Sequence, residues 1–417
     1  MYKHIYIVLV FVFILITKTS NAQNNTNSPY SIFALGAENI IATGALNGLG
    51  NSGIAQTNPL YINILNPASL GSIKQKSFLY EFGANATTST LRNSSTSSNV
   101  NNANLSHIAI AFPIRKNWGI GLGLTPFTKV GYEISFDREV LGSSNNNESF
   151  TTFNSGLGGL NRFYLASGAK LGNVISVGLE LSVLFGTVEE RSQLLSDGLV
   201  NITNESTYNG FNFRGGFQYT FPNKKTTIGS TFAFNSLVTG TTISNSFVTT
   251  NAGNINTIQD NEESEADNLE FPITFGIGVT SEIYKDFTAS LDFRKRLWDD
   301  ISQSLDNEEY TNQDTYAFGL EYKSSANNTK YWNKLSYRFG ANYNSGFLVI
   351  SNRQIDSYFL SLGLGIPLNR TGTNNINFSY SYGQEGTIDN NLIQENFHQF
   401  TLNLSFVGNW FNQRKIF

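Results

Sequence analysis

Apolar and polar residues alternate along most of this chain with the two-residue period of a half-buried β-strand. In the segment FTASLDFR, residues 287–294, apolar side chains occupy every second position and polar side chains occupy the positions between them. The segment QFTLNLSF, residues 399–406, repeats the pattern. Each predicted strand therefore has one apolar face and one face of small or polar residues.

About fourteen such segments follow one another, an even number of the kind found in single-chain transmembrane barrels. We predict strands at residues 76–90, 104–114, 117–136, 158–171, 174–188, 207–221, 225–238, 268–283, 286–299, 312–324, 334–346, 354–367, 374–384 and 397–410.

The connections between these segments alternate in length. Short ones, such as residues 172–173, alternate with long Asn/Ser/Thr-rich stretches that we interpret as outer loops, at residues 91–103, 137–157, 189–206 and 239–267. Short periplasmic turns and long outer loops are typical of a transmembrane β-barrel. A soluble β-sandwich has the same residue alternation, but the loop asymmetry and the aromatic end of the chain favour the barrel. We expect an all-β, transmembrane antiparallel β-barrel over residues 76–417.

The start of the chain predicts export. Lys3 precedes the apolar run IYIVLVFVFILI, and the small residues SNA precede Gln23, so we interpret residues 1–22 as a signal peptide. The alternative is a membrane anchor, but the run is shorter than the roughly 20 residues that span a bilayer. The expected location is the outer membrane of a Gram-negative cell.

Composition excludes several classes of function. The chain has 27 Lys and Arg against 31 Asp and Glu, without the basic block that would follow a nucleic acid backbone. It has no cysteine, which excludes disulfides, thiolate metal sites and thiol catalysis. After the signal peptide only His107 and His398 remain, neither within a nucleophile motif, so we predict no enzyme, no cofactor and no metal.

The acidic stretch DNEESEADN, residues 260–268, raises the question of a calcium site. Its spacing lacks the central glycine of an EF-hand loop. We therefore interpret it as a solvated outer loop.

Three stretches resemble the FadL family of outer-membrane transporters for long-chain fatty acids and other hydrophobic compounds. Residues 47–73 lead through glycines to Asn66, Pro67 and Ala68, while residues 269–293 and 314–346 are similar to later strand pairs of that family. The resemblance implies that residues 23–75 form a hatch, or plug, inside the barrel, with Asn66-Pro67-Ala68 in one of its turns.

The residues themselves support a filled lumen. Gly119, Gly121 and Gly123 are consecutive inward positions of the third predicted strand, which leaves space that another segment can occupy. The alternative is an unstructured periplasmic arm, but that arm would expose apolar residues such as Ile62 and Leu70.

Pro126 is the only proline well inside a predicted strand, and it removes a hydrogen bond from the ladder. The FadL resemblance implies an inward kink in the third strand that opens the wall sideways. We therefore expect Gly121, Gly123 and Pro126 to frame a lateral opening. The alternative is a bulge that only adjusts barrel shape.

Ionisable residues are expected on the inner face of the barrel. One or two of them could bind a ligand carboxylate, or they could pair with one another and with the hatch. They are Lys129, Glu133, Glu180, Arg214, Asp292, Arg294, Glu321 and Arg338.

Two functions remain open at this point. One is an outer-membrane channel for passive uptake of fatty-acid-like hydrophobic molecules, in contact with outer-membrane lipid. The other is a barrel of the same fold that serves as a non-transporting accessory subunit, with partners in an outer-membrane secretion or protein-assembly complex.

Overall fold

The computed structural model describes residues 26, 28–33, 36–38, 42–139, 149–195, 198–223, 225–301, 308–324, 331–369 and 371–409. The predicted signal peptide, residues 1–22, lies outside the described residues. Within the described part of the chain, no helix is both long and apolar enough to cross a membrane.

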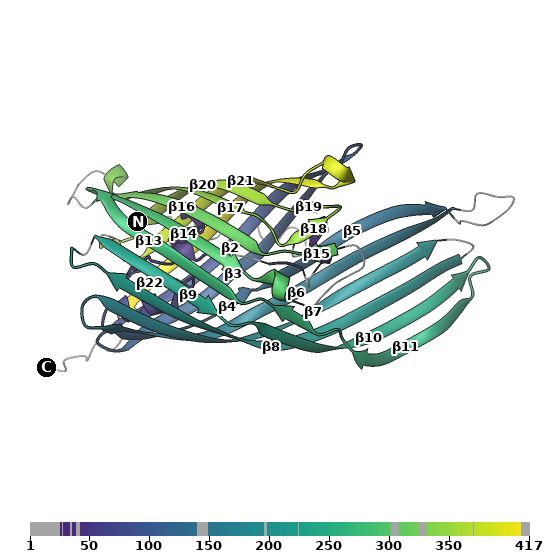
Figure 1. The fold of residues 1–417 in the computed structure, drawn as a ribbon, viewed down its shortest axis with the longest axis horizontal. Helices are drawn as coiled ribbons and strands as arrows, with labels where there is room; N and C mark the ends of the chain where they lie inside the picture. The colour runs from purple at the N-terminus through teal and green to yellow at the C-terminus, as the bar shows by residue number, and fades with distance from the viewer. Residues whose placement is uncertain are drawn as a thin grey trace, which may run out of the picture.

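The wall is a closed antiparallel barrel of 14 strands (Figure 1), which confirms the predicted fold class. The first wall strand, β2 (Ser77–Arg92), pairs along its whole length with the last, β22 (Gln394–Asn409). The strands between them are β3 (Ser97–Arg115), β4 (Trp118–Pro126), β5 (Thr128–Glu139), β6 (Ser149–Leu171), β7 (Ile175–Leu195), β8 (Gly198–Thr220), β9 (Thr226–Ala233), β10 (Ser236–Thr250), β11 (Ile255–Glu265), β12 (Leu269–Phe271), β13 (Thr274–Tyr284), β14 (Phe287–Arg296), β16 (Gln313–Lys323), β17 (Ser336–Asn344), β20 (Ser357–Pro367) and β21 (Asn375–Glu385). Three of the 14 wall strands are interrupted, because β4 and β5, β9 and β10, and β11, β12 and β13 each form a single wall strand.

Each predicted strand corresponds to a wall strand, but the stretches expected as long outer loops are mostly strand. For example, β8 and β10 pair without interruption from Gly210–Val238 to Gly198–Thr250. The acidic stretch expected as a loop lies largely in β11, where every residue is exposed. As a result, β5, β6, β7, β8, β10 and β11 extend beyond the rest of the barrel as one sheet (Figure 1). We call this part the projecting sheet.

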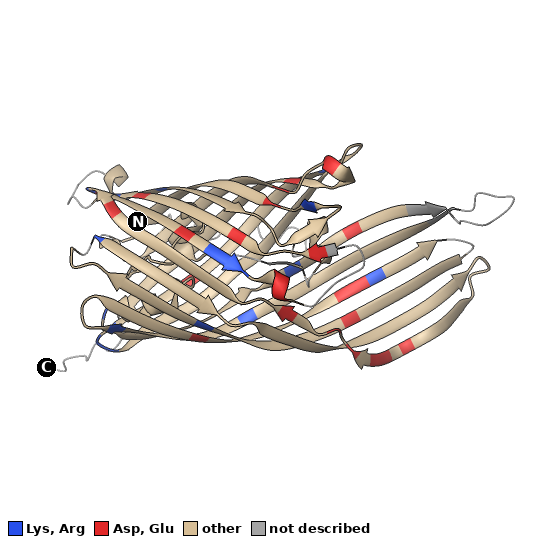
Figure 2. Cartoon of the chain, in the orientation of Figure 1, with Lys and Arg blue, Asp and Glu red and all other residues tan. Residues whose placement is uncertain are grey.

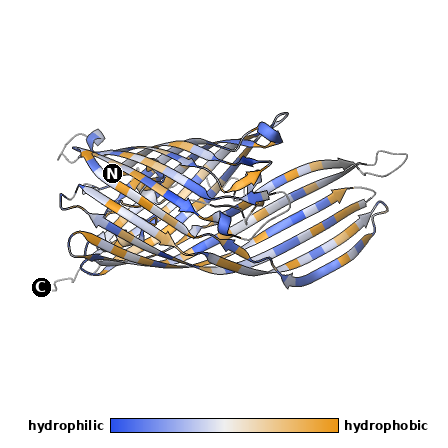
Figure 3. Cartoon of the chain, in the orientation of Figure 1, coloured by the Kyte–Doolittle hydropathy of each residue, from blue (hydrophilic) through white to orange (hydrophobic). Residues whose placement is uncertain are grey.

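The outer surface of the barrel is apolar next to the short turns. Large apolar side chains face outward there and are strongly exposed, and we call this surface the apolar band; it includes Leu165, Leu179, Phe211, Leu291, Leu360 and Leu402. Positions between them face the lumen and are small or polar, which gives the alternating colours of Figure 3. Because a closed barrel satisfies all its backbone hydrogen bonds, it can place such a surface in lipid. The protein is an outer-membrane barrel.

Residues 42–73, which we call the inner segment, lie inside this wall. Two short 3-10 helices organise it, η2 (Gly44–Leu49) and η3 (Pro67–Ser72). Helix η2 contacts β16, β17, β20, β21 and β22, and η3 contacts β3, β4, β6, β7 and β8. The segment therefore touches strands on opposite sides of the barrel.

Wall glycines let the inner segment approach this closely. A Cβ atom on Gly178 would lie 2.4 Å from the backbone nitrogen of Ala68, and one on Gly340 would lie 2.0 Å from that of Gly50. Any side chain at these positions would displace backbone. These wall glycines, which we call the glycine bed, therefore provide the space that the backbone of the inner segment occupies.

Smaller elements complete the two ends of the barrel. Helix η1 (Pro29–Ile32) and strand β1 (Ala37–Glu38) belong to what we call the N-terminal arm, residues 28–33 and 36–38. The remaining elements are η4 (Trp298–Asp300), β15 (Glu308–Tyr310), η5 (Tyr331–Lys334), β18 (Leu348–Ile350), β19 (Arg353–Gln354) and η6 (Asp389–Asn391).

Candidate ligand cavities and the break in the wall

Buried polar side chains of the wall bind the backbone of the inner segment. The Asp292 carboxylate accepts hydrogen bonds from the backbone N–H groups of Gly53, at 2.7 Å, and Ile54, at 3.0 Å. On the nearby strands β8 and β9, the carbonyls of Phe217 and Ser230 accept hydrogen bonds from the Asn66 side chain. These bonds anchor the inner segment to β8, β9 and β14, on one side of the barrel.

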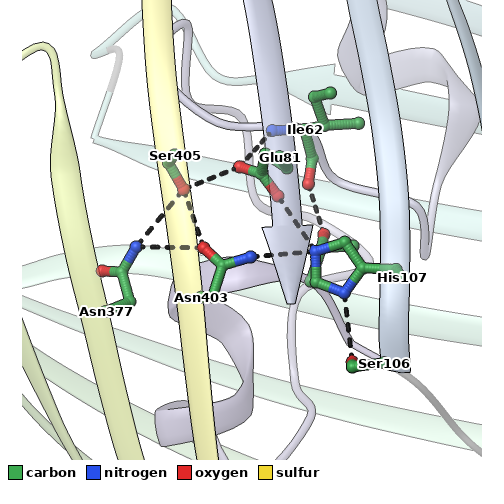
Figure 4. A network of polar contacts seen from close by, with 8 residues as sticks. Ile62, Glu81, Ser106, His107, Asn377, Asn403 and Ser405 are labelled. Carbon is green, nitrogen blue, oxygen red and sulfur yellow. Dashed lines mark hydrogen bonds and ion pairs between the residues drawn. The ribbon is translucent and has the colours of Figure 1, made fainter. Parts of the chain in front are cut away.

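A second set of bonds surrounds His107 (Figure 4). Its ring is fully buried, with Asn403 at 2.9 Å and the Glu81 carboxylate at 3.7 Å. The Glu81 carboxylate also accepts from the backbone N–H of Ile62 and from the Ser405 hydroxyl. His107 thus belongs to a buried network that holds the inner segment.

The wall is broken beside Pro126. Below this point β4 pairs with β3 on one side and β6 on the other, and the uppermost β3–β4 pair is Ile108–Leu124. Above it β5 continues the pairing with β6, but no β3–β5 pairing joins the described residues. The free edge of β5 is instead met by two residues of β1 from the N-terminal arm.

A one-residue bulge accompanies the break. Pro126 pairs with Asn161, whereas Val130 pairs with Gly158, so the β4–β5 side holds one extra residue. On β6, Gly158 and Gly159 have φ angles of 128° and 129°, which only glycine adopts readily. The bulge exchanges the two faces of the strand beyond it.

This exchange corrects the expected position of Glu133. Tyr132 faces inward and is buried, while Glu133 is exposed on the other face. The prediction of Glu133 as a lumen residue is therefore wrong, because it assumed unbroken alternation through Phe127.

The glycines expected at the opening lie below it. Gly121 packs against the Leu70 side chain of the inner segment, and Gly123 lies against the Tyr164 ring and the Ile108 carbonyl. A side chain at Gly123 would collide with both. Pro126 itself ends β4 at the break.

Two cavities meet at the break. The one that we call the gap cavity has a volume of about 140 Å³ and is lined by residues of β3, β4, β5 and β6, among them Leu105, Leu124, Pro126 and Lys129. The other, which we call the lumen cavity, has a volume of about 110 Å³ and lies between Pro126 and Phe127 of the wall and Ile54, Ile64 and Leu65 of the inner segment. Pro126 lines both.

Four arginines line the lumen cavity: Arg162, Arg214, Arg294 and Arg296. The Arg214 guanidinium donates to both oxygens of the buried Glu180 carboxylate, at 2.7 and 2.6 Å, and Arg162 lies 3.8 Å from the same group. Arg294 donates to the Asn51 carbonyl, and Arg296 donates to the Gln313 side chain. The cavity thus combines an apolar side with a group of cations.

The other predicted lumen residues lie elsewhere. Arg338 is buried with Glu321, at 2.8 Å, and also contacts Asn377. Lys129 lies above the break, near the outer end. Sequence reasoning missed Arg162 and Arg296, because their approach to Arg214 and Arg294 depends on barrel closure and on no local motif.

Solved structures share this fold. Residues covering 90% of the chain superpose on the whole of the Pseudomonas putida toluene transporter TodX, with a TM-score of 0.63 and 13% identity. The CymD monoaromatic hydrocarbon channel gives a TM-score of 0.62 at 15% identity, covering 90% of this chain and 100% of that one. A Pseudomonas aeruginosa FadL homologue gives 0.59 at 12% identity, with 90% and 100% coverage. The resemblance to FadL therefore holds at the level of the fold.

At the sequence level, no curated protein is detectably similar to the chain. A family model described as BamG matches residues 1–417.

Proposed function

The chain belongs to the BamG family, and from that premise and its FadL-type fold we propose that it is a channel for passive uptake of fatty-acid-like molecules. In this proposal the inner segment acts as a plug. The ligand leaves the barrel sideways, through the break beside Pro126. A sideways exit delivers a hydrocarbon chain toward lipid without full exposure to water.

The observation that carries the proposal is the pair of cavities that share Pro126. The lumen cavity lies inside the wall, and the gap cavity lies where β3 and β5 are unpaired. Leu124 faces outward beside the gap cavity, at the outer edge of the apolar band. A ligand moving from one cavity to the other would therefore pass close to the lipid surface.

The arginines support an anionic ligand. The described residues that line the lumen cavity include these four arginines and no Asp or Glu. A fatty acid could place its carboxylate among the guanidinium groups and its chain against Ile54, Ile64 and Phe271. An uncharged hydrocarbon would desolvate the same cations without pairing with them.

The test enlarges one side chain at the gap cavity. Leu124→Trp should fill the cavity from the lipid side and slow the passage of a fluorescent fatty acid into liposomes. Leu122→Trp is the matched control, because Leu122 lies two residues earlier on the same outward face and lines neither cavity. Equal passage rates in both variants and the parent would contradict the lateral route.

A second function is favoured by the projecting sheet. Six strands extend past the apolar band, and their edge strand β11 is fully exposed and carries the acidic residues Asp260, Glu262, Glu263 and Glu265 (Figure 2). Such a surface could contact other proteins outside the membrane, as an accessory subunit of an outer-membrane complex would. Extraction in mild detergent distinguishes the two functions. Stoichiometric protein partners would support the subunit, and a lone barrel with bound lipid would support the channel.

A further inference from the structure

A third cavity, of about 240 Å³, lies at the outer end of the barrel between the N-terminal arm and the wall. Residues lining it include Ser28, Lys129, Ser357, Glu385, Glu395 and Phe397. Glu385 is the last residue of β21, and Glu395 is the second residue of β22. Both lie beyond the apolar band, on the side away from the short turns.

The two carboxylates face each other directly. Glu385 and Glu395 are partners across the β21–β22 ladder, so their Cβ atoms are separated by about 4.5–5.5 Å. Both side chains line the same cavity, and Glu395 is 8% exposed. Among the described residues, no arginine or lysine forms an ion pair with either. Two ionised carboxylates so placed would repel each other.

Two buried hydroxyls lie beside the pair without hydrogen bonds of ordinary geometry. Ser89, on β2, is 1% exposed, and Ser28, on the N-terminal arm, is 3% exposed. Both lie close enough to the Glu395 carboxylate to favour its charged form. Yet neither hydroxyl, nor the Oε2 atom of Glu395, has a hydrogen-bond partner within the described residues. Unsatisfied buried oxygens cost free energy unless a further group binds them.

The electrostatics agree with a missing positive charge. Burial, and then the charge of Glu395, raises the pKa of Glu385 to about 8. Lys129 lines the same cavity, but burial lowers its pKa to about 8 and no carboxylate offsets that effect. At neutral pH the lysine stays largely protonated, but it forms no ion pair with either glutamate among the described residues.

We propose that Glu385 and Glu395, with the hydroxyls of Ser28 and Ser89, form a site for a divalent cation of the Ca²⁺ type. Hard cations of this kind bind carboxylate, hydroxyl and carbonyl oxygens in flexible geometries. The described residues contain no group of three or more acidic, histidine or cysteine side chains placed to hold a metal. Hydroxyl and backbone oxygens must therefore complete the coordination.

The site would connect the N-terminal arm to the last two wall strands. The Tyr30 hydroxyl already donates to the Ile393 carbonyl, at 2.6 Å, and accepts from its N–H, at 3.2 Å. A cation bound by Ser28 and both glutamates would add a second connection between the same two parts of the chain. This inference does not depend on whether the barrel transports a ligand.

The test measures Ca²⁺ binding to the detergent-purified full-length barrel by isothermal titration calorimetry after chelator treatment. We expect one site per chain, with a Kd on the order of 10⁻⁴ to 10⁻³ M, as in extracellular calcium sites. Glu385→Gln with Glu395→Gln should abolish binding. That variant should still fold, because each amide keeps the size of the carboxyl group that it replaces, and a heat-dependent shift in gel migration would report the folded barrel.

The matched control is Glu262→Gln with Glu263→Gln, which removes two exposed acidic side chains from β11. This variant should bind Ca²⁺ as the parent does. The proposal is overturned if the parent shows no heat of binding at a Ca²⁺ concentration about five times the upper end of the expected Kd range. It is also overturned if the β11 variant loses binding while the Glu385/Glu395 variant retains it.

Discussion

A disulfide between the inner segment and the wall would reveal whether the inner segment moves during the proposed transport. The hydroxyl oxygens of Ser52 and Ser290 lie 2.6 Å apart, and both residues are buried. The chain has no cysteine, so Ser52→Cys with Ser290→Cys allows a single disulfide. A disulfide requires about 2.05 Å between sulfurs, which a small adjustment of these side chains provides.

The strength of this connection can be estimated. The two positions are 238 residues apart, so the chain-entropy model gives about 5 kcal/mol of stabilisation relative to the unfolded chain. The inner segment is already held by hydrogen bonds such as those of Asp292, Asn66 and Glu81. At about 1 kcal/mol each, the whole set holds it by on the order of 10 kcal/mol. Spontaneous displacement of the segment is therefore rare even without the disulfide.

The assay compares oxidised and reduced protein in liposomes. Because the proposed route passes the break at Pro126 and leaves the plug in place, oxidised and reduced samples should take up the fluorescent fatty acid at the same rate. The single variant Ser290→Cys controls for the loss of the hydroxyl pair. Heat resistance of the folded band should rise on oxidation of the double variant alone.

One outcome would refute this reasoning. If oxidation stops uptake and reduction restores it, the inner segment must move away from β14 for the ligand to pass. The lateral route with a fixed plug would then be wrong, although the barrel would still be a channel.

Three further predictions concern the inner segment and the lumen cavity. Asp292→Ala leaves the N–H groups of Gly53 and Ile54 without their acceptor, which should cost about 2–4 kcal/mol and raise ion conductance in planar bilayers; unchanged conductance would show that other contacts suffice. Gly178→Ala should lower the temperature of barrel unfolding, whereas Gly215→Ala should not, because a Cβ at Gly215 meets nothing closer than 4.0 Å; equal temperatures would argue against the glycine bed. Arg162→Gln should weaken fatty acid binding roughly tenfold while leaving the binding of an uncharged fatty alcohol unchanged, since Glu180 keeps its bond to Arg214; equal losses for both ligands would mean that Arg162 does not bind the carboxylate.

The wall strands could be predicted from the sequence because each has an apolar face and a polar face, and because short turns such as residues 172–173 separate them. The projecting strands could not. In β11 every residue is exposed to solvent, and the other projecting strands have both polar and apolar residues on their outer faces. Asn, Ser and Thr therefore take many of the positions that are apolar in the other wall strands. A stretch without apolar alternation is read as a loop even when backbone pairing makes it a strand.

The break was only partly predictable. Pro126 indicated an interruption in its strand, but one extra residue leaves no mark in the sequence, and the inner and outer faces beyond it were exchanged. Gly158 and Gly159 lie opposite the bulge, but their positive φ angles are visible only in the structure. Arg162 and Arg296 both line the lumen cavity because barrel closure brings β6 and β14 to face the same cavity.

The seam between β2 and β22 sets an order for assembly of the protein. The inner segment precedes β2 in the chain and touches wall strands nearly all the way round, from β3 to β22. Once β2 and β22 pair over their full length, the segment can no longer enter sideways between them. The seam therefore favours an order in which the segment is in place before β2 and β22 pair, so that any machinery inserting this barrel handles an open sheet already wrapped around the chain's own N-terminal residues.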